Sequence, residues 1–511
     1  MPVRTAFPRI CIALGLPDPE RLLEQAQREA AQGERFLEFR LDYLPSPEEG
    51  VAVIREFLRL YPDATVLATC RRHQNRGRFN GSIEEEIRIL AAAIRAGARA
   101  VDIEVESAEN ALARIELLGD AQLVISYHNY EGTPALDPLM RRMLKIPAAA
   151  YKIVTTARKP SDNLKVLSLL KAHGRLPLVL LAMTETGFPT RVLCPVLGGA
   201  FTYAAPSTSE GTAAGQVCAR TLRHLYRVEK PWKACKIFGV VADPVRHSIS
   251  PAVHNRALQA RRVAALYLPF LVGSLQLKDF FVLADRLPLH GFSVTIPHKQ
   301  RIIRYLDSLD PLSRRIGAVN TVWRKAGKWR GTNTDIDGIR LPLEKRIRVS
   351  RKSVLVAGNG GAARAAAFAL MDAGARVSIT GRNADRVRAL AKSCGGETAI
   401  SEQLAGAHYD ILVHATPLGM WPHVEECFFD GKIPADVVFD LVYNPERTVL
   451  LKRASAQGCE TIPGVEMFIE QAARQFEIFT GENAPRAVMQ QAAREALAEQ
   501  FNHVNHAPSH G

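Results

Sequence analysis

The stretch from Arg227 to Asn255 reads RVEKPWKACKIFGVVADPVRHSISPAVHN and divides the chain into two halves. Its charged, proline-containing beginning, residues 227–233, is typical of an exposed connection between domains. An apolar strand is predicted directly after it, at 236–241, and from there on the sequence pattern changes. The two halves are therefore expected to fold as separate domains.

Two serines follow that strand at the start of a predicted helix. Ser248 and Ser250 precede Pro251, and proline is favoured in the first turn of a helix. Hydroxyl groups beside a helix N-terminus suit a small ligand rich in oxygen. A lone Ser-Pro pair more often serves only as a helix cap. The rest of the sequence has to decide between these two interpretations.

Length and composition indicate a globular protein with about two to four domains, because the chain has 511 residues, 47% hydrophobic and 23% charged. The net charge of +14 is spread along the chain, which argues against a nucleic-acid partner and agrees with small anionic substrates. The eight cysteines form no Cys-x-x-Cys pair, so no bound metal or disulfide framework is expected. With no signal peptide and no membrane-spanning run, a cytoplasmic location is predicted.

Short apolar runs alternate with helical patterns through the first half. Eight strands in about 220 residues match the number and size of a (β/α)8 TIM barrel. A doubly wound sheet is the alternative, but this half has no glycine-rich phosphate turn. The predicted strands are Arg9–Leu14, Phe36–Leu41, Thr65–Cys70, Ala100–Val105, Leu123–His128, Ala149–Thr155, Leu178–Met183 and Val196–Tyr203.

Charged side chains stand at the ends of these predicted strands, where the active sites of barrel enzymes lie. Lys152 is set in an apolar strand, and a desolvated amine there can form a Schiff base with a ketone. His128, on the neighbouring strand, is placed to move a proton beside it. The other charged residues at strand ends are Glu38, Arg40, Arg71 and Glu104.

This half resembles the type I 3-dehydroquinate dehydratases through motifs in the family's order: Glu38-Phe-Arg40-Leu-Asp42, Ser126-Tyr-His128-Asn-Tyr, Thr133-Pro134, Tyr151-Lys152-Ile-Val and Gly215-Gln216. The resemblance implies that Lys152 forms an imine with the substrate ketone. It implies that His128 removes the adjacent proton and later protonates the departing hydroxyl. Arg191, in the loop after the seventh strand, would bind the carboxylate. The hydroxyls and ring would be held by Glu38, Arg40, Arg71, Thr212 and Gln216.

Two positions depart from that family's pattern. The family has Glu-Gly-Gly after the arginine of the third strand, whereas this chain reads Arg71-Arg-His-Gln-Asn75-Arg-Gly77. Asn75 therefore bears on the geometry of the substrate lid. Thr212 stands where a serine is usual, and the hydroxyl group is kept.

A glycine-rich turn is the strongest signal in the second half. The run Ser353-Val-Leu-Val-Ala-Gly358-Asn-Gly360-Gly-Ala-Ala363 matches G-x-G-x-x-A between a predicted strand and helix, where pyrophosphate is bound. The next predicted strand, Arg376–Thr380, ends in Gly381-Arg382-Asn383 without the acid of an NAD site, so NADP(H) is predicted. The predicted cofactor site comprises Gly358, Asn359, Gly360, Gly361, Ala362, Arg382, Asn383, Leu441 and Gly464.

The second half as a whole resembles shikimate dehydrogenase, through motifs around Ser248, Thr295-Ile-Pro-His-Lys299, Ala318-Val-Asn320-Thr321, Asn333-Thr-Asp335, Ala415-Thr-Pro-Leu-Gly419 and Gly464-Val-Glu-Met467. The resemblance implies proton transfer by Lys299 and Asp335. It implies that shikimate is bound by Ser248, Ser250, Thr295, Asn320, Tyr443 and Gln471. The departures are Asn359, where alanine is usual, and His414, where asparagine is usual.

Together the two resemblances predict a bifunctional enzyme of aromatic amino-acid biosynthesis. The first half would dehydrate 3-dehydroquinate to 3-dehydroshikimate, and the second would reduce 3-dehydroshikimate to shikimate with NADPH. An NAD-linked quinate/shikimate dehydrogenase and a metabolite-sensing pseudoenzyme are the alternatives. The presence of Lys152, His128, Lys299 and Asp335 argues against the pseudoenzyme, and Arg382 argues against the NAD-linked enzyme.

The predicted architecture is α/β throughout. A TIM barrel is expected at 1–228, a linker at 229–235 and a shikimate-binding subdomain at 236–340, completed by C-terminal helices at about 465–502. A Rossmann NADP-binding subdomain is expected at 341–464. The tail from 502 to 511 is predicted to be disordered, and the oligomeric state is left open.

Overall fold

The computed structural model describes residues 7–111, 115–207, 211–212, 215–230, 232, 234–399, 404 and 406–505. The chain forms two compact units, the first mainly within residues 1–235 and the second mainly within the remainder. Residues 231 and 233 of the predicted linker and residues 506–511 of the predicted disordered tail lie outside the described residues.

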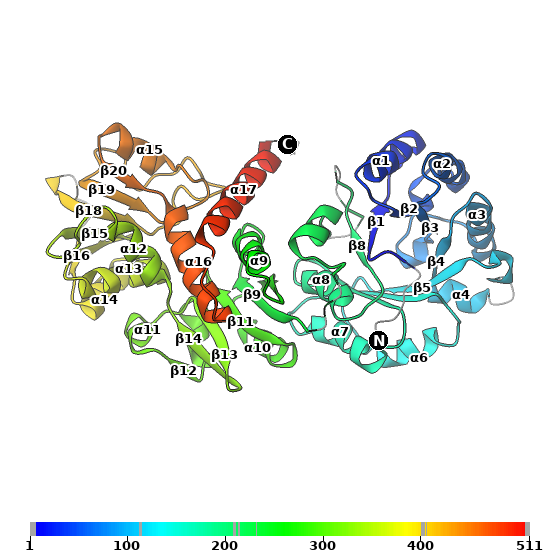
Figure 1. Ribbon diagram of the computed structural model, residues 1–511, viewed down its shortest axis with the longest axis horizontal. Coiled ribbons are helices and arrows are strands. Elements are labelled where there is room, and N and C mark those ends of the chain that lie inside the picture. Colours follow the sequence, from blue (N-terminus) through cyan, green and yellow to red (C-terminus); the bar gives the residue numbers. More distant parts are fainter. Residues whose placement is uncertain are drawn as a thin grey trace. The chain divides into compact units, whose positions relative to one another are not determined.

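The first unit is a parallel eight-stranded barrel surrounded by helices (Figure 1). Neighbouring strands pair in the order β7-β6-β5-β4-β3-β2-β1-β8. Between β7 and β8, N of Ala200 donates to O of Leu178 at 2.7 Å. The strands are β1 (Ile10–Leu14), β2 (Phe36–Arg40), β3 (Thr65–Thr69), β4 (Ala100–Glu104), β5 (Gln122–His128), β6 (Ala150–Thr156), β7 (Leu178–Met183) and β8 (Thr202–Ala204). The predicted TIM barrel is confirmed.

The helices of this unit follow the strands in alternation. They begin at residues suited to caps: Ser82, for example, accepts from N of Glu85, whose side chain accepts from N of Ser82 in return. The helices are α1 (Pro19–Ala31), α2 (Pro47–Leu60), α3 (Ile83–Arg95), α4 (Val105–Asn110), α6 (Asp137–Met143), α7 (Asp162–Ala172) and α8 (Phe188–Val196).

Aromatic rings fill the end of the barrel at which the strands begin. Phe36, the first residue of β2, lies 5.4 Å from Phe7 and 5.1 Å from Phe201 between ring centroids. All three side chains are buried. Each such pair contributes about 0.5–1.5 kcal/mol beyond the burial of its area. The apolar plug leaves the opposite end, where the strands finish, for polar side chains.

One predicted strand is wrong. The run Val196–Tyr203 was expected to be a strand, but Val196 ends helix α8 and β8 begins only at Thr202. All nine residues of α8 are buried. A short, fully buried apolar run carries no periodicity, so a helix and a strand look alike in sequence.

The second unit contains two six-stranded sheets (Figure 1). The first is mixed, with the order β10-β9-β11-β13-β14-β12. Its strands are β9 (Lys236–Ala242), β10 (Ala265–Leu271), β11 (Leu289–Val294), β12 (Ser308–Leu309), β13 (Thr321–Lys325) and β14 (Lys328–Thr332). Its helices are α9 (Ser250–Ala260), α10 (Leu277–Arg286), α11 (Pro311–Ile316) and α12 (Asp335–Glu344).

The second sheet is parallel and has the order β17-β16-β15-β18-β19-β20. Chain order reverses at β15, between β16 and β18, which is the switch point where such sheets bind ligands. Its strands are β15 (Ser353–Ala357), β16 (Arg376–Thr380), β17 (Glu397–Thr398), β18 (Tyr409–His414), β19 (Ala435–Asp440) and β20 (Glu460–Ile462), and its helices are α13 (Gly361–Asp372), α14 (Ala384–Cys394) and α15 (Val449–Ala456). The predicted Rossmann-type sheet is confirmed.

The chain ends in two helices, α16 (Gly464–Thr480) and α17 (Arg486–Asn505). Helix α16 packs on α12 and on strands β11 and β13, and so returns to the mixed sheet. The prediction of disorder is wrong for residues 502–505, which belong to α17. Across the described ranges, none of the helices combines the length and the apolar character needed to cross a membrane.

Glu86 is a buried carboxyl group on the inner face of α3, only 1% exposed. Oγ of Ser107 donates to its Oε2 at 2.8 Å. Burial raises the pKa of Glu86 from 4.5 to about 7, although the hydrogen bond from Ser107 opposes the change. Between these two values the folded protein keeps a proton that the unfolded chain has lost. The stability of the neutral form is therefore present below pH 4.5 and is lost as the pH rises through 7.

We predict that Glu86→Gln raises the free energy of unfolding at pH 8 by about 2 kcal/mol relative to the unchanged protein, with little effect at pH 4.5. The amide keeps an oxygen that accepts from Ser107, and it carries no charge to desolvate. Urea unfolding of both proteins at the two pH values measures the difference. A gain of the same size at both would show that the charge of Glu86 is not its cause.

Candidate active sites

Lys152 lies on β6 inside the barrel mouth, the end at which the strands finish, and is 3% exposed. Its Nζ donates to Oδ2 of Asp102 at 2.7 Å and to Oη of Tyr203 at 3.2 Å. It also lies 3.7 Å from Oε1 of Glu38. Groups from β2, β4 and β8 therefore hold one amine in a single position.

The register of the strands explains why these side chains meet. Glu104 on β4 is level with Ser126 on β5, and Ser126 is level with Lys152 on β6. Alternate residues of a strand point to the same face, so Asp102 and Glu104 both point into the barrel. The layer they form is set by backbone pairing and needs no loop to assemble it.

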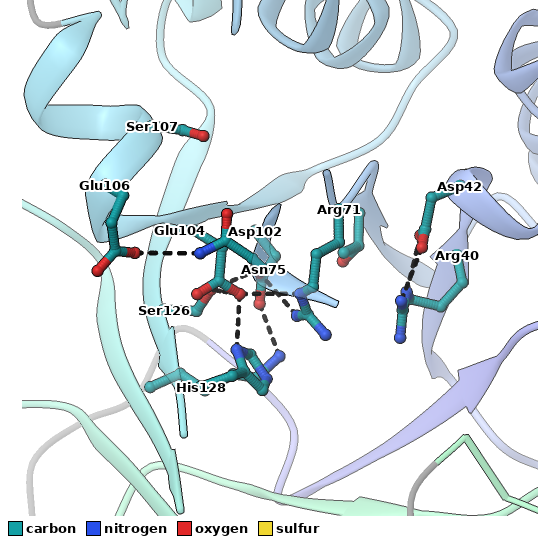
Figure 2. Close-up of polar contacts among 12 residues, drawn as sticks. Arg40, Asp42, Arg71, Asn75, Asp102, Glu104, Glu106, Ser107, Ser126 and His128 are labelled. Carbon is teal, nitrogen blue, oxygen red and sulfur yellow. Dashed lines mark hydrogen bonds and ion pairs between the residues drawn. The ribbon is translucent and has the colours of Figure 1, made fainter. Parts of the chain in front are cut away.

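Two carboxylates on β4, Asp102 and Glu104, connect Lys152 with His128. Figure 2 shows both carboxylates and the histidine. Oε1 of Glu104 lies 2.6 Å from Nδ1 of His128 and 2.8 Å from Nε of Arg71. Oγ of Ser126 lies 2.7 Å from Oδ1 of Asp102 and 3.1 Å from Oε1 of Glu104. The cluster is continuous from the amine to the imidazole, and Nε2 of His128 is the ring nitrogen that does not face Glu104.

Burial and neighbouring charges shift the pKa values of this cluster in different directions. Burial alone would raise the pKa of Asp102, but Lys152 and Arg71 outweigh it and the pKa is lowered. For Glu104 burial prevails, and its pKa is raised. Burial, followed by Arg71 and Lys152, lowers the pKa of His128 well below its ordinary value. The imidazole is therefore neutral at pH 7 and able to accept a proton.

The structure brings five of the predicted residues into this one cluster: Glu38, Arg71, Glu104, His128 and Lys152. Arg40 makes a bidentate pair with Asp42, at 2.9 and 2.8 Å (Figure 2). Thr212 lies against Gly15, which follows β1: a Cβ built on Gly15 would be 2.9 Å from Cγ2 of Thr212. Gln216 lies against Gly211 in the same loop.

Arg191 was expected in a loop, and this prediction is wrong. It lies in helix α8 and is 1% exposed, so it is among the most deeply buried cations of the chain. Burial lowers its pKa to about 10. A cation from which water has been removed to this degree is strongly attracted to an anionic group of a ligand.

Asp102 and Tyr203 touch the amine of Lys152 and were not predicted. Asp102 did leave a signal, since the run AVDIE places two acids two residues apart in an otherwise apolar strand, where both face the interior. Tyr203 left none, because a tyrosine at the end of an apolar run is more often part of the core.

Asn75, which stands where the resembling family has glutamate, ties its loop to the barrel. It ends the short helix η2 (His73–Asn75), and its Nδ2 donates to Oε2 of Glu106 on α4 at 3.3 Å (Figure 2). Glu106 also pairs with Arg142, at 3.3 Å. A glutamate at position 75 would face Glu106 with like charge. The amide therefore suits this chain, in which position 106 carries the carboxylate.

In the second unit, Lys299 and Asp335 form a direct pair. Nζ of Lys299 donates to Oδ2 of Asp335 at 2.5 Å. Nδ2 of Asn320 donates to Oδ1 of the same carboxylate at 2.8 Å and lies 3.4 Å from Oε1 of Gln471. These four predicted residues come from the loop after β11, the start of α12, the residue before β13 and helix α16.

A buried chain of hydrogen bonds, from Tyr267 through Ser293 and Gln475, holds the backbone of Asn320 in place. Tyr267 donates to Oγ of Ser293 at 2.6 Å, and Ser293 donates to Oε1 of Gln475 at 2.7 Å. Nε2 of Gln475 lies 3.1 Å from both O of Asn320 and Oγ1 of Thr321. Gln475 was not predicted, because a glutamine one turn after Gln471 on a helix carries no distinguishing pattern.

The remaining predicted substrate residues lie on neighbouring elements. N of Ser250, the first residue of α9, donates to Oγ of Ser248 at 3.3 Å. N of Thr295 donates to O of Val241 at 3.1 Å. The ring of Tyr443 packs on Phe468 at 5.0 Å, and burial raises its pKa to about 12.

The glycine-rich turn after β15 has the shape needed for a phosphate. Gly358 has φ 129°, and a Cβ there would lie 2.8 Å from O of Ala415. Around Gly360 no atom lies within 4 Å of a built Cβ, so a ligand can approach the backbone. The first N–H groups of α13, including those of Gly361 and Ala362, have no partner within the helix. This turn fits the pyrophosphate of a dinucleotide.

The side chain of Lys299 contacts the end of the glycine-rich turn. A Cβ on Gly361 would lie 2.9 Å from Cδ and 3.1 Å from Cβ of Lys299. The stem of the lysine therefore rests on the first residue of α13, and the proton-transfer pair adjoins the predicted nucleotide site.

The other predicted cofactor residues lie in the glycine-rich turn, after β16, after β19 and at the start of α16. Asn359 lies beside Gly381, and Arg382 is exposed at the end of β16. Oδ1 of Asn383 accepts from N of Arg386 at 3.0 Å and so caps helix α14. Leu441 directly follows β19, and its N donates to O of His414 at 2.9 Å. Gly464 packs so closely on the backbone of 441–442 that a side chain there would collide with it.

Family models match both units. Residues 10–231 match the model of type I 3-dehydroquinase. Residues 240–322 match the substrate binding domain of shikimate dehydrogenase, residues 342–419 match shikimate/quinate 5-dehydrogenase, and residues 464–494 match the C-terminal domain of shikimate 5'-dehydrogenase.

Some similar proteins align with nearly the whole chain, and others align with about half of it. The bifunctional 3-dehydroquinate dehydratase/shikimate dehydrogenase, chloroplastic, of Arabidopsis thaliana is 33% identical over 505 residues, 93% of this chain and 83% of that protein. The shikimate dehydrogenase (NADP(+)) of Thermosynechococcus vestitus is 39% identical over 274 residues, 51% of this chain and 96% of that one. A solved structure, shikimate 5-dehydrogenase of Thermus thermophilus with NADP(H) and shikimate, is 33% identical, with TM-score 0.48, over 51% of this chain and 99% of that one.

We predict that Asn75→Glu loosens the loop at 72–80, because it places a second carboxylate beside Glu106. Amide hydrogen exchange of this loop should become about fivefold faster. The double variant Asn75→Glu/Glu106→Gln removes the repulsion and should restore slow exchange. Unchanged exchange in the single variant, or no restoration in the double one, would mean that the contact with Glu106 does not hold the loop.

Proposed function

The chain belongs to the family of bifunctional 3-dehydroquinate dehydratase/shikimate dehydrogenases, and on this premise we propose which residues carry its two reactions. The enzyme is a lyase in its first half and an oxidoreductase in its second. We assign the dehydratase to residues 1–228, the shikimate-binding subdomain to 236–340 with the C-terminal helices, and the nucleotide-binding subdomain to 341–464.

In the dehydratase, Lys152 is the nucleophile. Its amine attacks the ketone of 3-dehydroquinate, and loss of one water gives an imine that is protonated on nitrogen. The positive nitrogen draws electrons from the adjacent carbon and so acidifies its C–H bond. Asp102, 2.7 Å from Nζ, holds the amine in place and stabilises the positive nitrogen.

His128 moves the proton. The neutral imidazole accepts it from the carbon beside the imine, while Glu104 stabilises the imidazolium that forms. The electron pair left on the carbon expels the hydroxyl group two carbons away from the imine. His128 returns its proton to this hydroxyl, which leaves as water. Hydrolysis of the imine then releases 3-dehydroshikimate and restores the amine.

The buried cluster around Lys152 is the observation that carries this assignment, because it places one amine and one neutral imidazole on a shared carboxylate pair. Arg191 is proposed to bind the substrate carboxylate. The hydroxyls and the ring are proposed to be held by Glu38, Arg40, Arg71, Thr212 and Gln216.

We predict that Lys152→Met abolishes dehydration and leaves the reduction of 3-dehydroshikimate unchanged. A single assay separates the two steps, since loss of NADPH absorbance with 3-dehydroquinate requires both sites and with 3-dehydroshikimate requires only the second. Borohydride added with 3-dehydroquinate to the unchanged enzyme should fix the ligand on Lys152, as read by mass spectrometry. Failure to find this adduct would sink the imine, whatever the folding of the variant.

In the second half, Lys299 and Asp335 are proposed as the proton-transfer pair. When bound, NADPH would supply the hydride that the ketone carbon of 3-dehydroshikimate accepts. Lys299 gives a proton to the oxygen on which negative charge develops, and Asp335 keeps the ammonium aimed at it. Asn320 and Gln471, which meet at this carboxylate, are proposed to hold substrate hydroxyls with Ser248, Ser250, Thr295 and Tyr443.

NADP(H) is the proposed cofactor. Relatives such as that of Thermosynechococcus vestitus are named NADP(+) enzymes. Arg382 is exposed at the end of β16, and no acidic side chain pairs with it among the residues that the structure describes. A guanidinium there suits a 2′-phosphate, whereas an NAD site carries an acid. This arrangement disfavours the NAD-linked quinate/shikimate dehydrogenase.

We predict that Arg382→Ala weakens NADPH binding about tenfold, a loss of about 1.4 kcal/mol, and leaves NADH binding unchanged. Arg388→Ala is the matched control, since Arg388 lies on the helix that follows, α14, and pairs with Asp385 at 2.5 Å. Fluorescence titration of both nucleotides measures the affinities. Equal weakening of NADPH and NADH would refute a contact with the 2′-phosphate.

Location and other partners remain predictions. The Arabidopsis relative is described as chloroplastic; for this chain we propose the cytoplasmic location expected from the sequence. The absence of a metal, of nucleic acid and of a membrane partner is likewise an expectation.

A further inference from the structure

His414 ends β18 and forms a buried polar array with two neighbours. It is 1% exposed, and Asp440, level with it on β19, is fully buried. Nδ1 of His414 lies 2.8 Å from Oδ1 of Asp440, and its Nε2 lies 2.5 Å from Oγ1 of Thr416. The reactions assigned above use none of these three side chains.

The partners of Asp440 determine how the imidazole is oriented. Its carboxylate also accepts from N of Val442 at 3.1 Å and from Oγ1 of Thr448 at 2.6 Å. A carboxylate surrounded by donors requires that Nδ1 of His414 carry a proton. In the neutral ring, Nε2 then accepts from the hydroxyl of Thr416. The hydroxyl proton points toward the ring, one lone pair of the oxygen accepts from N of Leu418 at 3.3 Å, and the other lone pair is left for a further donor.

The array lies at the switch point of the parallel sheet. His414 is level with Ala357, the last residue of β15, and a Cβ on Gly358 would touch O of Ala415. Thr416 therefore follows the strand directly beside the glycine-rich turn. Ligands of such sheets cross the carboxyl ends of the strands at this point.

An asparagine at position 414 could not make the same array. Its amide occupies the place of Nδ1 and reaches Asp440, but it is too short to reach Thr416 as well. Only a side chain with a second polar atom farther out connects the buried carboxylate with the hydroxyl. Histidine does so with a rigid ring, which also packs against Phe428 at 5.9 Å.

We propose that His414 is a positioning residue of the dinucleotide site: held by Asp440, it fixes the hydroxyl of Thr416 as a hydrogen-bond acceptor for a donor group of the bound dinucleotide. The donor is a ribose hydroxyl or an amide or amino N–H, since phosphate oxygens only accept. This inference rests on the proposed use of a dinucleotide by this site. It assigns to Thr416 a contact with a part that NADPH and NADH share.

The test measures binding in the full-length protein without substrate. NADPH is titrated by fluorescence against the unchanged enzyme, His414→Asn, Thr416→Val and the double variant. Each single change should raise Kd about tenfold. The double variant should bind no more weakly than either single one, because both break the same arrangement. Thr416→Ser, which keeps the hydroxyl, should bind as the unchanged enzyme does.

Shikimate binding and dehydratase activity serve as controls and should not change, because neither His414 nor Thr416 is assigned to either of those two sites. Unchanged Kd values, or effects of the two single changes that add in the double variant, would overturn the proposal. So would weakened shikimate binding, which would show general damage.

Titration with NADH distinguishes this proposal from that of NADP(H) preference. His414→Asn should weaken NADH by the same factor as NADPH, whereas Arg382→Ala should affect NADPH alone. If the enzyme bound NADH and not NADPH, the assignment of NADP(H) as cofactor would be wrong. The role of His414 would then be tested by the NADH affinities of the same variants. If it bound neither, both proposals would fall.

Discussion

The need to pair every buried charge governs the first unit. Lys152 and Arg71 are buried in the barrel mouth, and an isolated buried charge is strongly destabilising. Asp102 and Glu104, both on β4, offset them; Lys152 lies on β6, and Arg71 lies two residues after β3. Because the strands themselves position the charges, the site is as rigid as the barrel. Burial, followed by the charges of Arg71 and Lys152, lowers the pKa of His128 and so gives the neutral imidazole that the chemistry requires.

The second unit meets a similar demand with amides and hydroxyls. One ion pair, between Lys299 and Asp335, is supported by Asn320, and Asn320 is supported through Gln475 by Ser293. Amides both donate and accept, so such a chain can end at a carboxylate without adding charge. The use of charged groups in the first site and of amides in the second agrees with the two reactions. A covalent intermediate needs an activated amine, whereas a hydride acceptor needs an aligned proton donor.

Much of the architecture could be predicted because alternating apolar runs and the glycine-rich turn are local signals. The nucleophile Lys152, the base His128 and the pair of Lys299 and Asp335 could be predicted through motifs. Asp102 and Gln475 could not, since their importance arises only when distant strands and helices bring them to the site. Arg191 was misplaced in a loop because a short, fully buried helix has no periodicity to reveal it. The role of His414 is equally invisible in sequence, where it is only an unusual residue.

The aromatic plug of Phe7, Phe36 and Phe201 lies at one end of the barrel, and the charged cluster lies at the other. Substitutions that stabilise a protein near its active site often lower its catalytic rate. Here the two demands occupy opposite ends of the same strands. Substitutions that improve packing in the plug should therefore raise thermal stability without altering the catalytic residues at the other end. The added stability would allow the protein to tolerate destabilising mutations elsewhere, including ones that change the active site.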